Sequence, residues 1–180
     1  MRYILFFLLV TNIYASVEER MLSLYQEKKY KASCRLGFEH FLEFKQDEAA
    51  ISLYGFSCLK SDYIDRLAIP ITALKYSKEA RANAAYFSAI LMQKKLLYHA
   101  LIDNYSLAGL NLPTTDYVLS RVFDLYAQIK SPSKQEYYIF QDPADEKRSY
   151  KLYIIKDRKI YKMVIEEFYD TILQQRHIYW

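Results

Sequence analysis

Two cysteines and two glycines are placed symmetrically about Gln46. Cys34 and Cys58 lie at equal distances on either side of it, and so do Gly37 and Gly55. If the chain folds back there into an antiparallel helical hairpin, the cysteines face one another and each glycine shares its cysteine's helix face. Helix axes normally lie ~8–10 Å apart, whereas a disulfide needs Cα atoms about 4.4–6.8 Å apart. Facing glycines would allow that approach, so the pattern predicts a helical hairpin joined by a Cys34–Cys58 disulfide.

The two thiols have one chemical alternative. Arg35 follows Cys34 directly, and a neighbouring positive charge can activate a cysteine nucleophile. The mirrored second cysteine favours a bridge instead. The spacing contains no CxxC pair and matches no zinc pattern, so no metal site is predicted.

The first fifteen residues have the layout of a secretory signal. Arg2 gives a positive start, Tyr3–Val10 form a short apolar run, and Ala15 closes a plausible cleavage site before Ser16. The run is too short for the ~20 apolar residues of a membrane span. We therefore predict a signal peptide over 1–15 and a periplasmic or secreted protein without a transmembrane segment. A buried N-terminal helix is the alternative. Export also favours the disulfide, because bridges persist in oxidising compartments.

Three polar segments recur at a common period along the next part of the chain. Gln26–Tyr30, Leu59–Tyr63 and Met92–Leu96 each stand between runs with the apolar spacing of one-sided helices. They predict three helical hairpins. A further helix is expected from Thr115 to about Lys130, without a partner helix after it. Another all-α layout remains the alternative.

Paired helices at this period resemble the tetratricopeptide repeat, whose unit is 34 residues. The resemblance covers residues 17–130. Gly55 matches the close-packing glycine of a first helix, and Tyr25 matches the aromatic that follows it. Ala100 and Phe38 match the small residue and the later aromatic of a second helix. The resemblance implies a mainly α fold in which residues 16–130 stack as about three and a half antiparallel hairpins.

Residues 131–180 change to an alternating apolar pattern, which indicates strands. Folding the chain across Asp157 and Arg158 places Leu152 opposite Met163, and makes one face of a β-hairpin wholly apolar.

Two further elements are expected around this hairpin. Tyr137–Phe140 could add a third strand, since two strands alone are marginal. Glu166–Gln175 has helical apolar spacing and predicts a closing helix. The whole unit is expected to pack on the helical array as an appendage.

The chain offers no recognisable catalytic motif. Its three glycines could hardly build a nucleotide-binding loop. His40 and His99 are expected on helices as solvated or partly buried polar residues, and His177 near a helix C-terminus. The formal net charge of +4 is too balanced to indicate nucleic acid. We therefore predict no enzyme activity, no cofactor and no nucleic-acid partner.

A stacked array of hairpins presents a concave face for another protein. The resemblance places Phe56, Lys60, Gln93 and Tyr126 on that face. The predicted function is an exported, non-enzymatic interaction or scaffolding module that binds another envelope protein or a peptide; self-association is left open. The alternative is a small-ligand carrier or an enzyme, with a pocket between the helices and the aromatic C-terminal unit.

Overall fold

A computed structural model describes residues 15–129 and 135–180 of the chain, so the predicted signal peptide lies outside the described residues except for Ala15. The described residues form seven α-helices, one short 3-10 helix and four strands. The helical elements are α1 (Val17–Gln26), α2 (Tyr30–Glu39), α3 (Phe41–Phe44), α4 (Glu48–Lys60), η1 (Ile64–Leu67), α5 (Ala68–Ala73), α6 (Lys78–Asp103) and α7 (Val118–Ala127). The strands are β1 (Tyr137–Asp142), β2 (Asp145–Asp157), β3 (Ile160–Tyr169) and β4 (Ile172–Tyr179). None of the described helices is both long and apolar enough for a membrane span.

The predicted disulfide hairpin is present. The chain reverses between α3 and α4, where the Asp47 side chain accepts hydrogen bonds from the backbone amides of Ala49 and Ala50 and so caps α4. The antiparallel helices α2 and α4 then bring the Cα atoms of Cys34 and Cys58 to 4.7 Å, and the structure joins the two sulfurs in a disulfide. Both cysteines are fully buried.

The glycines of this hairpin have a different role from the predicted one. A Cβ added at Gly37 would lie 2.6 Å from Cδ2 of Tyr54, and one added at Gly55 would lie 2.5 Å from Cε2 of Phe87. Each glycine therefore receives an aromatic ring rather than the other glycine. The ring of Phe87 comes from α6, so Gly55 sets the distance between the hairpin and the next helix.

Replacing Gly55 by alanine is expected to destabilise the protein by about 2 kcal/mol, because the new methyl group overlaps a fully buried ring. The helix propensity of alanine acts in the opposite direction, by up to about 1 kcal/mol. Chemical denaturation of Gly55→Ala, of Phe87→Leu and of the double variant would measure the effect. The smaller leucine should make room for the methyl group, so the double variant should lose less than the sum of the two singles. Strictly additive losses would contradict this account.

The predicted stack of three and a half hairpins is wrong, and the chain has a mixed α/β fold. The expected turn Met92–Leu96 lies inside α6, a single helix of 26 residues. Its polar residues are good helix formers, and Lys94 is buried rather than solvated. The Lys94 ammonium donates hydrogen bonds to Asp65 at 3.0 Å and to the backbone oxygen of Trp180 at 2.6 Å. The polar pattern at this point therefore reflects a buried lysine that pairs with the half-exposed Asp65 instead of a turn.

The C-terminal strands form one antiparallel sheet in the order β1-β2-β3-β4. The third strand predicted at Tyr137–Phe140 is confirmed as β1. In the β2–β3 hairpin Leu152 pairs with Ile165 rather than Met163. The register differs by two residues, which keeps the same side chains on the same face because the side-chain period of a strand is two.

The predicted helix Glu166–Gln175 is also wrong. The chain continues as β3, turns at Asp170 and Thr171, and returns as β4. Both turn residues have positive φ (46° and 68°), as in the two-residue hairpin turns that match strand twist. Phe168 and Leu173, which stand at helical spacing, are paired across this hairpin. Short apolar patterns of this kind fit either element, and strand pairing decided between them.

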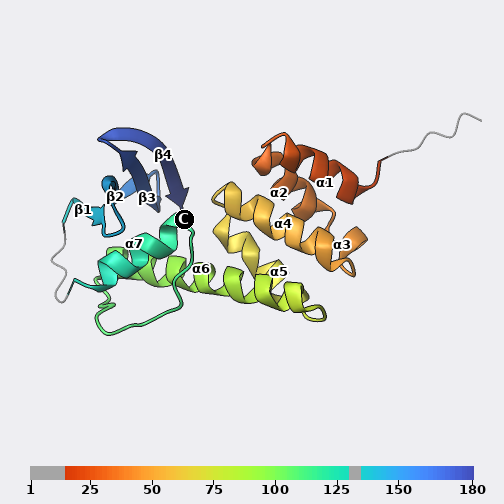
Figure 1. Ribbon diagram of the computed structural model, residues 1–180, viewed down its shortest axis with the longest axis horizontal. Coiled ribbons are helices and arrows are strands. Elements are labelled where there is room, and N and C mark those ends of the chain that lie inside the picture. The colour runs from red at the N-terminus through yellow and green to blue at the C-terminus, as the bar shows by residue number, and fades with distance from the viewer. Residues whose placement is uncertain (1–14, 130–134) are drawn as a thin grey trace, which may run out of the picture.

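Helix α6 runs along both halves of the molecule (Figure 1). The helices α1 to α5 gather over one part of it, whereas α7 and the sheet lie over the other. The buried side chains form one continuous hydrophobic core that reaches from Met21 in α1 to Tyr179 in β4. The Tyr126 ring of α7 meets the Tyr138 ring of β1 at 5.1 Å, which joins this helix to the sheet.

Candidate functional site

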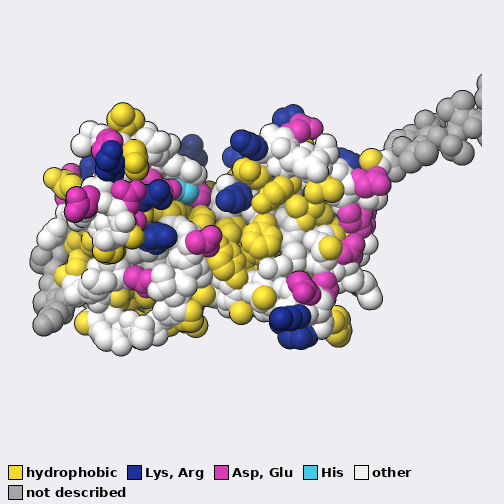
Figure 2. All heavy atoms as spheres, in the orientation of Figure 1, with side chains coloured by type: hydrophobic (Ala, Val, Ile, Leu, Met, Phe, Trp, Pro, Cys, Tyr) yellow, Lys and Arg dark blue, Asp and Glu magenta, His cyan; other side chains and the backbone are white. Residues whose placement is uncertain are grey.

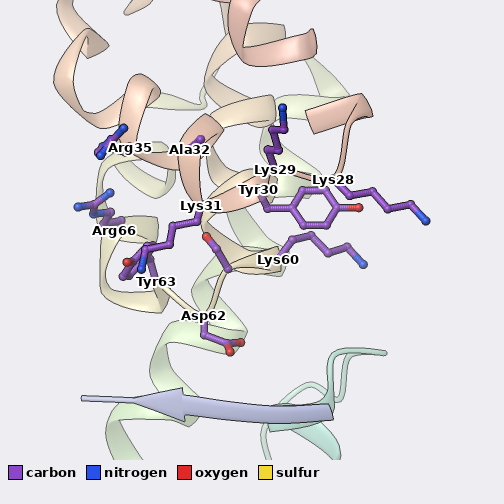
Figure 3. A pocket seen from close by; sticks show the side chains of 11 residues that line it. Lys28, Lys29, Tyr30, Lys31, Ala32, Arg35, Lys60, Asp62, Tyr63 and Arg66 are labelled. Carbon is purple, nitrogen blue, oxygen red and sulfur yellow. The ribbon is translucent and has the colours of Figure 1, made fainter. Parts of the chain in front are cut away.

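A groove of about 650 Å³ lies between the start of α2 and the turn that follows α4. Figure 3 shows that its two walls come from these two segments. Six of the side chains that line it are basic, and two tyrosines contribute rings. The basic residues are Lys28, Lys29, Lys31, Arg35, Lys60 and Arg66, and the tyrosines are Tyr30 and Tyr63. We call this surface the cationic groove.

The disulfide hairpin explains why the two segments meet. Because α2 and α4 are antiparallel, the beginning of α2 lies beside the end of α4. Each neighbouring turn contains a residue with positive φ, Lys28 (59°) before α2 and Asp62 (64°) after α4. These left-handed residues reverse the chain sharply. The disulfide between the two helices then fixes the walls of the groove relative to one another.

The groove has more positive charge than its own carboxylates neutralise. Lys29 pairs with Glu27 at 2.7 Å, and Arg35 lies 4.0 Å from Glu39, both in exposed positions. Among the described residues, no other acidic side chain lies within the 4.0 Å limit of a salt bridge to the remaining basic residues of the groove. Those remaining residues are Lys28, Lys31, Lys60 and Arg66.

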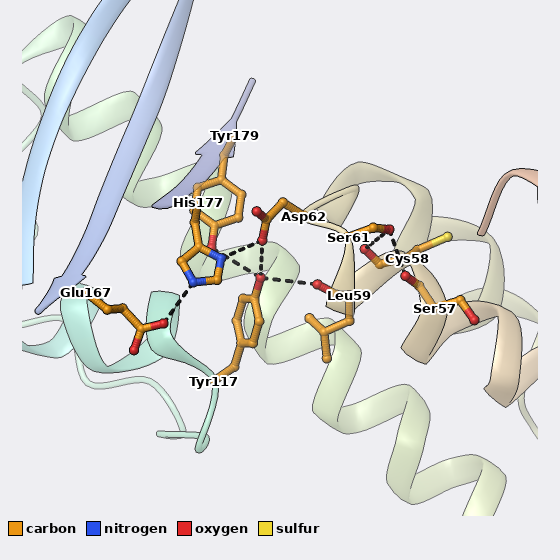
Figure 4. A network of polar contacts seen from close by, with 9 residues as sticks. All are labelled: Ser57, Cys58, Leu59, Ser61, Asp62, Tyr117, Glu167, His177 and Tyr179. Atoms are coloured by element: carbon orange, nitrogen blue, oxygen red, sulfur yellow. Dashed lines mark hydrogen bonds and ion pairs between the residues drawn. The ribbon is translucent and has the colours of Figure 1, made fainter. Parts of the chain in front are cut away.

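The one carboxylate that lines the groove is committed elsewhere. Asp62 Oδ1 lies 2.8 Å from Nδ1 of His177 and accepts a hydrogen bond of 2.9 Å from the hydroxyl of Tyr117. As Figure 4 shows, Asp62 points from the turn after α4 toward the sheet. It therefore neutralises a charge of the sheet rather than the lysines of the groove.

His177 of β4 connects the helices to the sheet. Its Nδ1 faces Asp62, and its Nε2 lies 2.9 Å from Glu167 of β3. Burial alone would lower the pKa of His177, but the hydrogen bonds and charges of Asp62 and Glu167 outweigh it and raise the pKa to about 9. The ring is therefore an imidazolium at neutral pH. We call these residues, with Tyr117 and Tyr179, the junction cluster.

The imidazole and the two tyrosine hydroxyls of the junction cluster all have partners within the cluster. Both ring nitrogens of His177 have carboxylate partners, and the Tyr117 hydroxyl lies between Asp62 and the Tyr179 hydroxyl, 3.2 Å from the latter. Burial raises the pKa of both tyrosines well above the ordinary value. A general base needs an unoccupied acceptor that can reach a substrate. The His177 ring has none, so its contacts link the helices to the sheet.

A second cleft, of about 400 Å³, lies between the helices and the sheet, where the alternative function places a pocket. The arginines that line it, Arg121 and Arg148, lie near a carboxylate outside the cleft lining, Asp142. Asp142 is buried, accepts a hydrogen bond of 2.6 Å from Tyr150 and lies 3.6 Å from Arg121. Burial alone would raise the pKa of Asp142, but the hydrogen bonds from Tyr150 and the Ala144 amide and the charges of Arg121 and Arg148 lower it. The arginines of this cleft therefore have internal counterions, unlike Lys28, Lys31, Lys60 and Arg66 of the cationic groove.

The structure separates the four predicted binding residues. Lys60 lines both the cationic groove and the second cleft, and Phe56 lines the second cleft. Gln93 is fully buried and donates to the backbone oxygen of Pro113, and Tyr126 is buried beneath the sheet. The last two were assigned from groove positions of a repeat that this chain does not form.

Other residues of the site were not predicted. Lys28, Lys29 and Tyr30 were recognised in the sequence only as part of the expected turn Gln26–Tyr30, and Lys31 follows it directly. Arg66 and His177 carried no such local signal. His177 meets Asp62 across 115 residues of sequence. Among the described residues, no group of three or more side chains could hold a metal ion.

The surface around the groove has a mixed character. Figure 2 shows hydrophobic side chains gathered over the middle of one face, with basic side chains at their border. The fold and the groove thus define a mixed α/β protein with an anion-attracting surface next to apolar rings. Comparisons with protein-family models, curated proteins and solved structures found no match.

Proposed function

We propose that this protein is an exported, non-enzymatic binding module whose cationic groove holds an acidic segment of another protein. The observation that carries the proposal is the surplus of basic side chains around one groove, in which four of the six form no salt bridge with the described residues. An acidic partner would supply the missing charge. Complementary charges of this kind also speed association and select partners.

The apolar part of the groove lining is a reason to expect a protein as the partner. The rings of Tyr30 and Tyr63 and the methyl group of Ala32 line the groove together with the basic residues. Tyrosine and arginine are enriched among the residues that contribute most to protein–protein binding. The groove thus offers a partner protein both an apolar surface that its side chains can cover and positive charges that its carboxylates can pair with.

Export is supported by the layout of residues 1–15 and by the buried disulfide, which is compatible with an oxidising compartment. In a Gram-negative bacterium this compartment would be the periplasm, and the partner an envelope protein.

Reversing three charges of the groove is expected to weaken binding of an acidic peptide about a hundredfold. The variant combines Lys28→Glu, Lys31→Glu and Lys60→Glu, and each reversed contact should cost about 1 kcal/mol. The probe is a fluorescently labelled peptide of about eight glutamates, and the readout is its anisotropy at low and at physiological salt. Wild-type binding should weaken as salt screens the charges.

The matched control changes the net charge equally at exposed lysines outside the groove, with Lys45→Glu, Lys75→Glu and Lys78→Glu. Equal weakening in both triple variants would mean that only overall charge matters, and the groove would not be the site. Cross-linking in envelope extracts then tests whether a natural protein partner binds at the same groove as the peptide. A genuine partner should be captured by the wild type and by the control variant but not by the groove variant.

A further inference from the structure

Arg66 differs from the other basic residues of the groove because two rings hold its guanidinium. The central carbon of the guanidinium lies 4.5 Å from the centroid of the Phe38 ring and 4.7 Å from that of Tyr63. Tyr63 belongs to the turn after α4 and lines the groove, whereas Phe38 stands near the end of α2, outside the groove lining, so Arg66 is held from both helices of the disulfide hairpin. Such contacts restrict a long side chain that would otherwise sample many rotamers.

The donors of this restrained group have little to bind within the protein. Nη1 of Arg66 lies 3.5 Å from the sulfur of Cys34, which is a weak acceptor. No carboxylate in the described parts of the chain lies within 4.0 Å of the guanidinium. A planar group with several N–H donors and no anionic partner is therefore held at the edge of the groove.

The lysines of the groove are placed differently. The Lys31 ammonium lies 5.8 Å from the Tyr63 ring centroid, and Lys28 and Lys60 are exposed. In Figure 3, Arg66 and Arg35 lie toward one end of the groove, whereas Lys28 and Lys60 lie toward the other. Flexible ammonium groups attract an anion from many directions, but only a fixed guanidinium can impose a planar, two-point geometry on a carboxylate.

We infer that Arg66 is the anchor that binds a carboxylate of the acidic segment through two parallel N–H···O hydrogen bonds. The lysines supply attraction without fixed geometry. This inference rests on the proposed function of the groove and adds to it the residue that determines how the ligand is oriented. It also defines the ligand group as a planar oxyanion on a side chain that can reach the Arg66 end.

The test uses charge-conserving substitutions and the same labelled glutamate peptide. Arg66→Lys should weaken binding about tenfold, because the positive charge remains but the two-point geometry is lost. Arg35→Lys is the matched control, since Arg35 lines the same groove but has no ring contact among the described residues, and it should change affinity less than about twofold. The salt dependence should be the same in all three proteins because the charges are the same.

A second variant separates anchoring from stability. Phe38→Leu removes one of the two rings that contact the Arg66 guanidinium and leaves the guanidinium itself in place. Because the Phe38 side chain is 47% exposed, its loss should disturb the core little. Binding should weaken to a value between those of the wild type and Arg66→Lys, with an unchanged melting temperature. If Arg66→Lys bound the peptide with wild-type affinity, or if Arg35→Lys lost as much affinity as Arg66→Lys, the inference that Arg66 is the anchor would be wrong. In that case, loss of binding in the groove triple variant would still support the proposed function. Retention of binding in that triple variant would reject the function itself.

Discussion

Replacing His177 by glutamine is expected to lower the free energy of unfolding by about 3 kcal/mol below pH 6.5 and by much less above about pH 9. The His177 side chain is only 6% exposed, and its ring lies between Asp62 and Glu167. Removing the cation leaves two partly buried carboxylates facing an uncharged amide. Breaking such a pair by deleting one partner is costly because the remaining charges lose their compensation.

The pH dependence follows from the direction of the pKa shift. Folding raises the pKa of His177 from an ordinary 6.5 to about 9, so the folded protein holds this proton more tightly than the unfolded chain does. The resulting stabilisation is complete below pH 6.5 and is lost as the pH rises through about 9. The wild type should therefore become less stable across this window, whereas His177→Gln should show a flatter profile.

Urea denaturation at several pH values would measure both profiles. His99→Gln is a suitable control because the His99 side chain is 49% exposed and lies 3.7 Å from its single carboxylate partner, Asp103. It should follow the wild-type curve. If the curves of the wild type and His177→Gln run parallel from pH 6.5 to about 9, the junction does not depend on the imidazolium.

Removing the disulfide is expected to cost about 3 kcal/mol, the value that the chain-entropy model gives for a loop of this size. The bridge closes 24 residues of sequence and joins α2 to α4. Cys34→Ser, Cys58→Ser and the double variant should all lose similar amounts of stability, because either single substitution already opens the same bridge.

Denaturation with and without a thiol reductant provides the control. Reductant should bring the wild type to the stability of the variants and leave the variants unchanged. Losses that add up in the double variant would instead show two independent core thiols. Binding of the acidic peptide should also weaken on reduction, since the bridge holds the two walls of the cationic groove in register.

The sequence was most informative where the structure is local. The Cys34–Cys58 hairpin and its turn were predicted because both partners lie within one short stretch, placed symmetrically about Gln46. The role of Gly55 was missed because its partner, Phe87, lies 32 residues further along the chain, in another helix. The predicted register of the β2–β3 hairpin was wrong by two residues. The alternation of apolar residues shows which side chains share a face of the sheet, but it does not determine where the chain turns.

Elements that depend on distant contacts could not be predicted in this way. Lys94 looked like part of a polar turn, since its partner Asp65 becomes visible only in the folded protein. The segment Glu166–Gln175, which forms the end of β3 and the beginning of β4, has helical apolar spacing, and only the pairing of these strands shows its structure. The cationic groove needs residues from two turns that the disulfide brings together, and Phe56 and Lys60 were chosen for a repeat that is absent. Periodicity describes one element at a time, whereas these features arise between elements.

The position of Asp62 between the cationic groove and His177 has a consequence for how the protein could respond to a bound acidic segment. One carboxylate borders the cationic groove and also balances the imidazolium of His177. An anion arriving nearby would deepen the negative potential around that ring and make its proton harder to remove. By reciprocity, protonation of His177 would increase the affinity of the groove for the anion by the same factor. Binding of the acidic segment and the contact between the helices and the sheet would therefore stabilise one another.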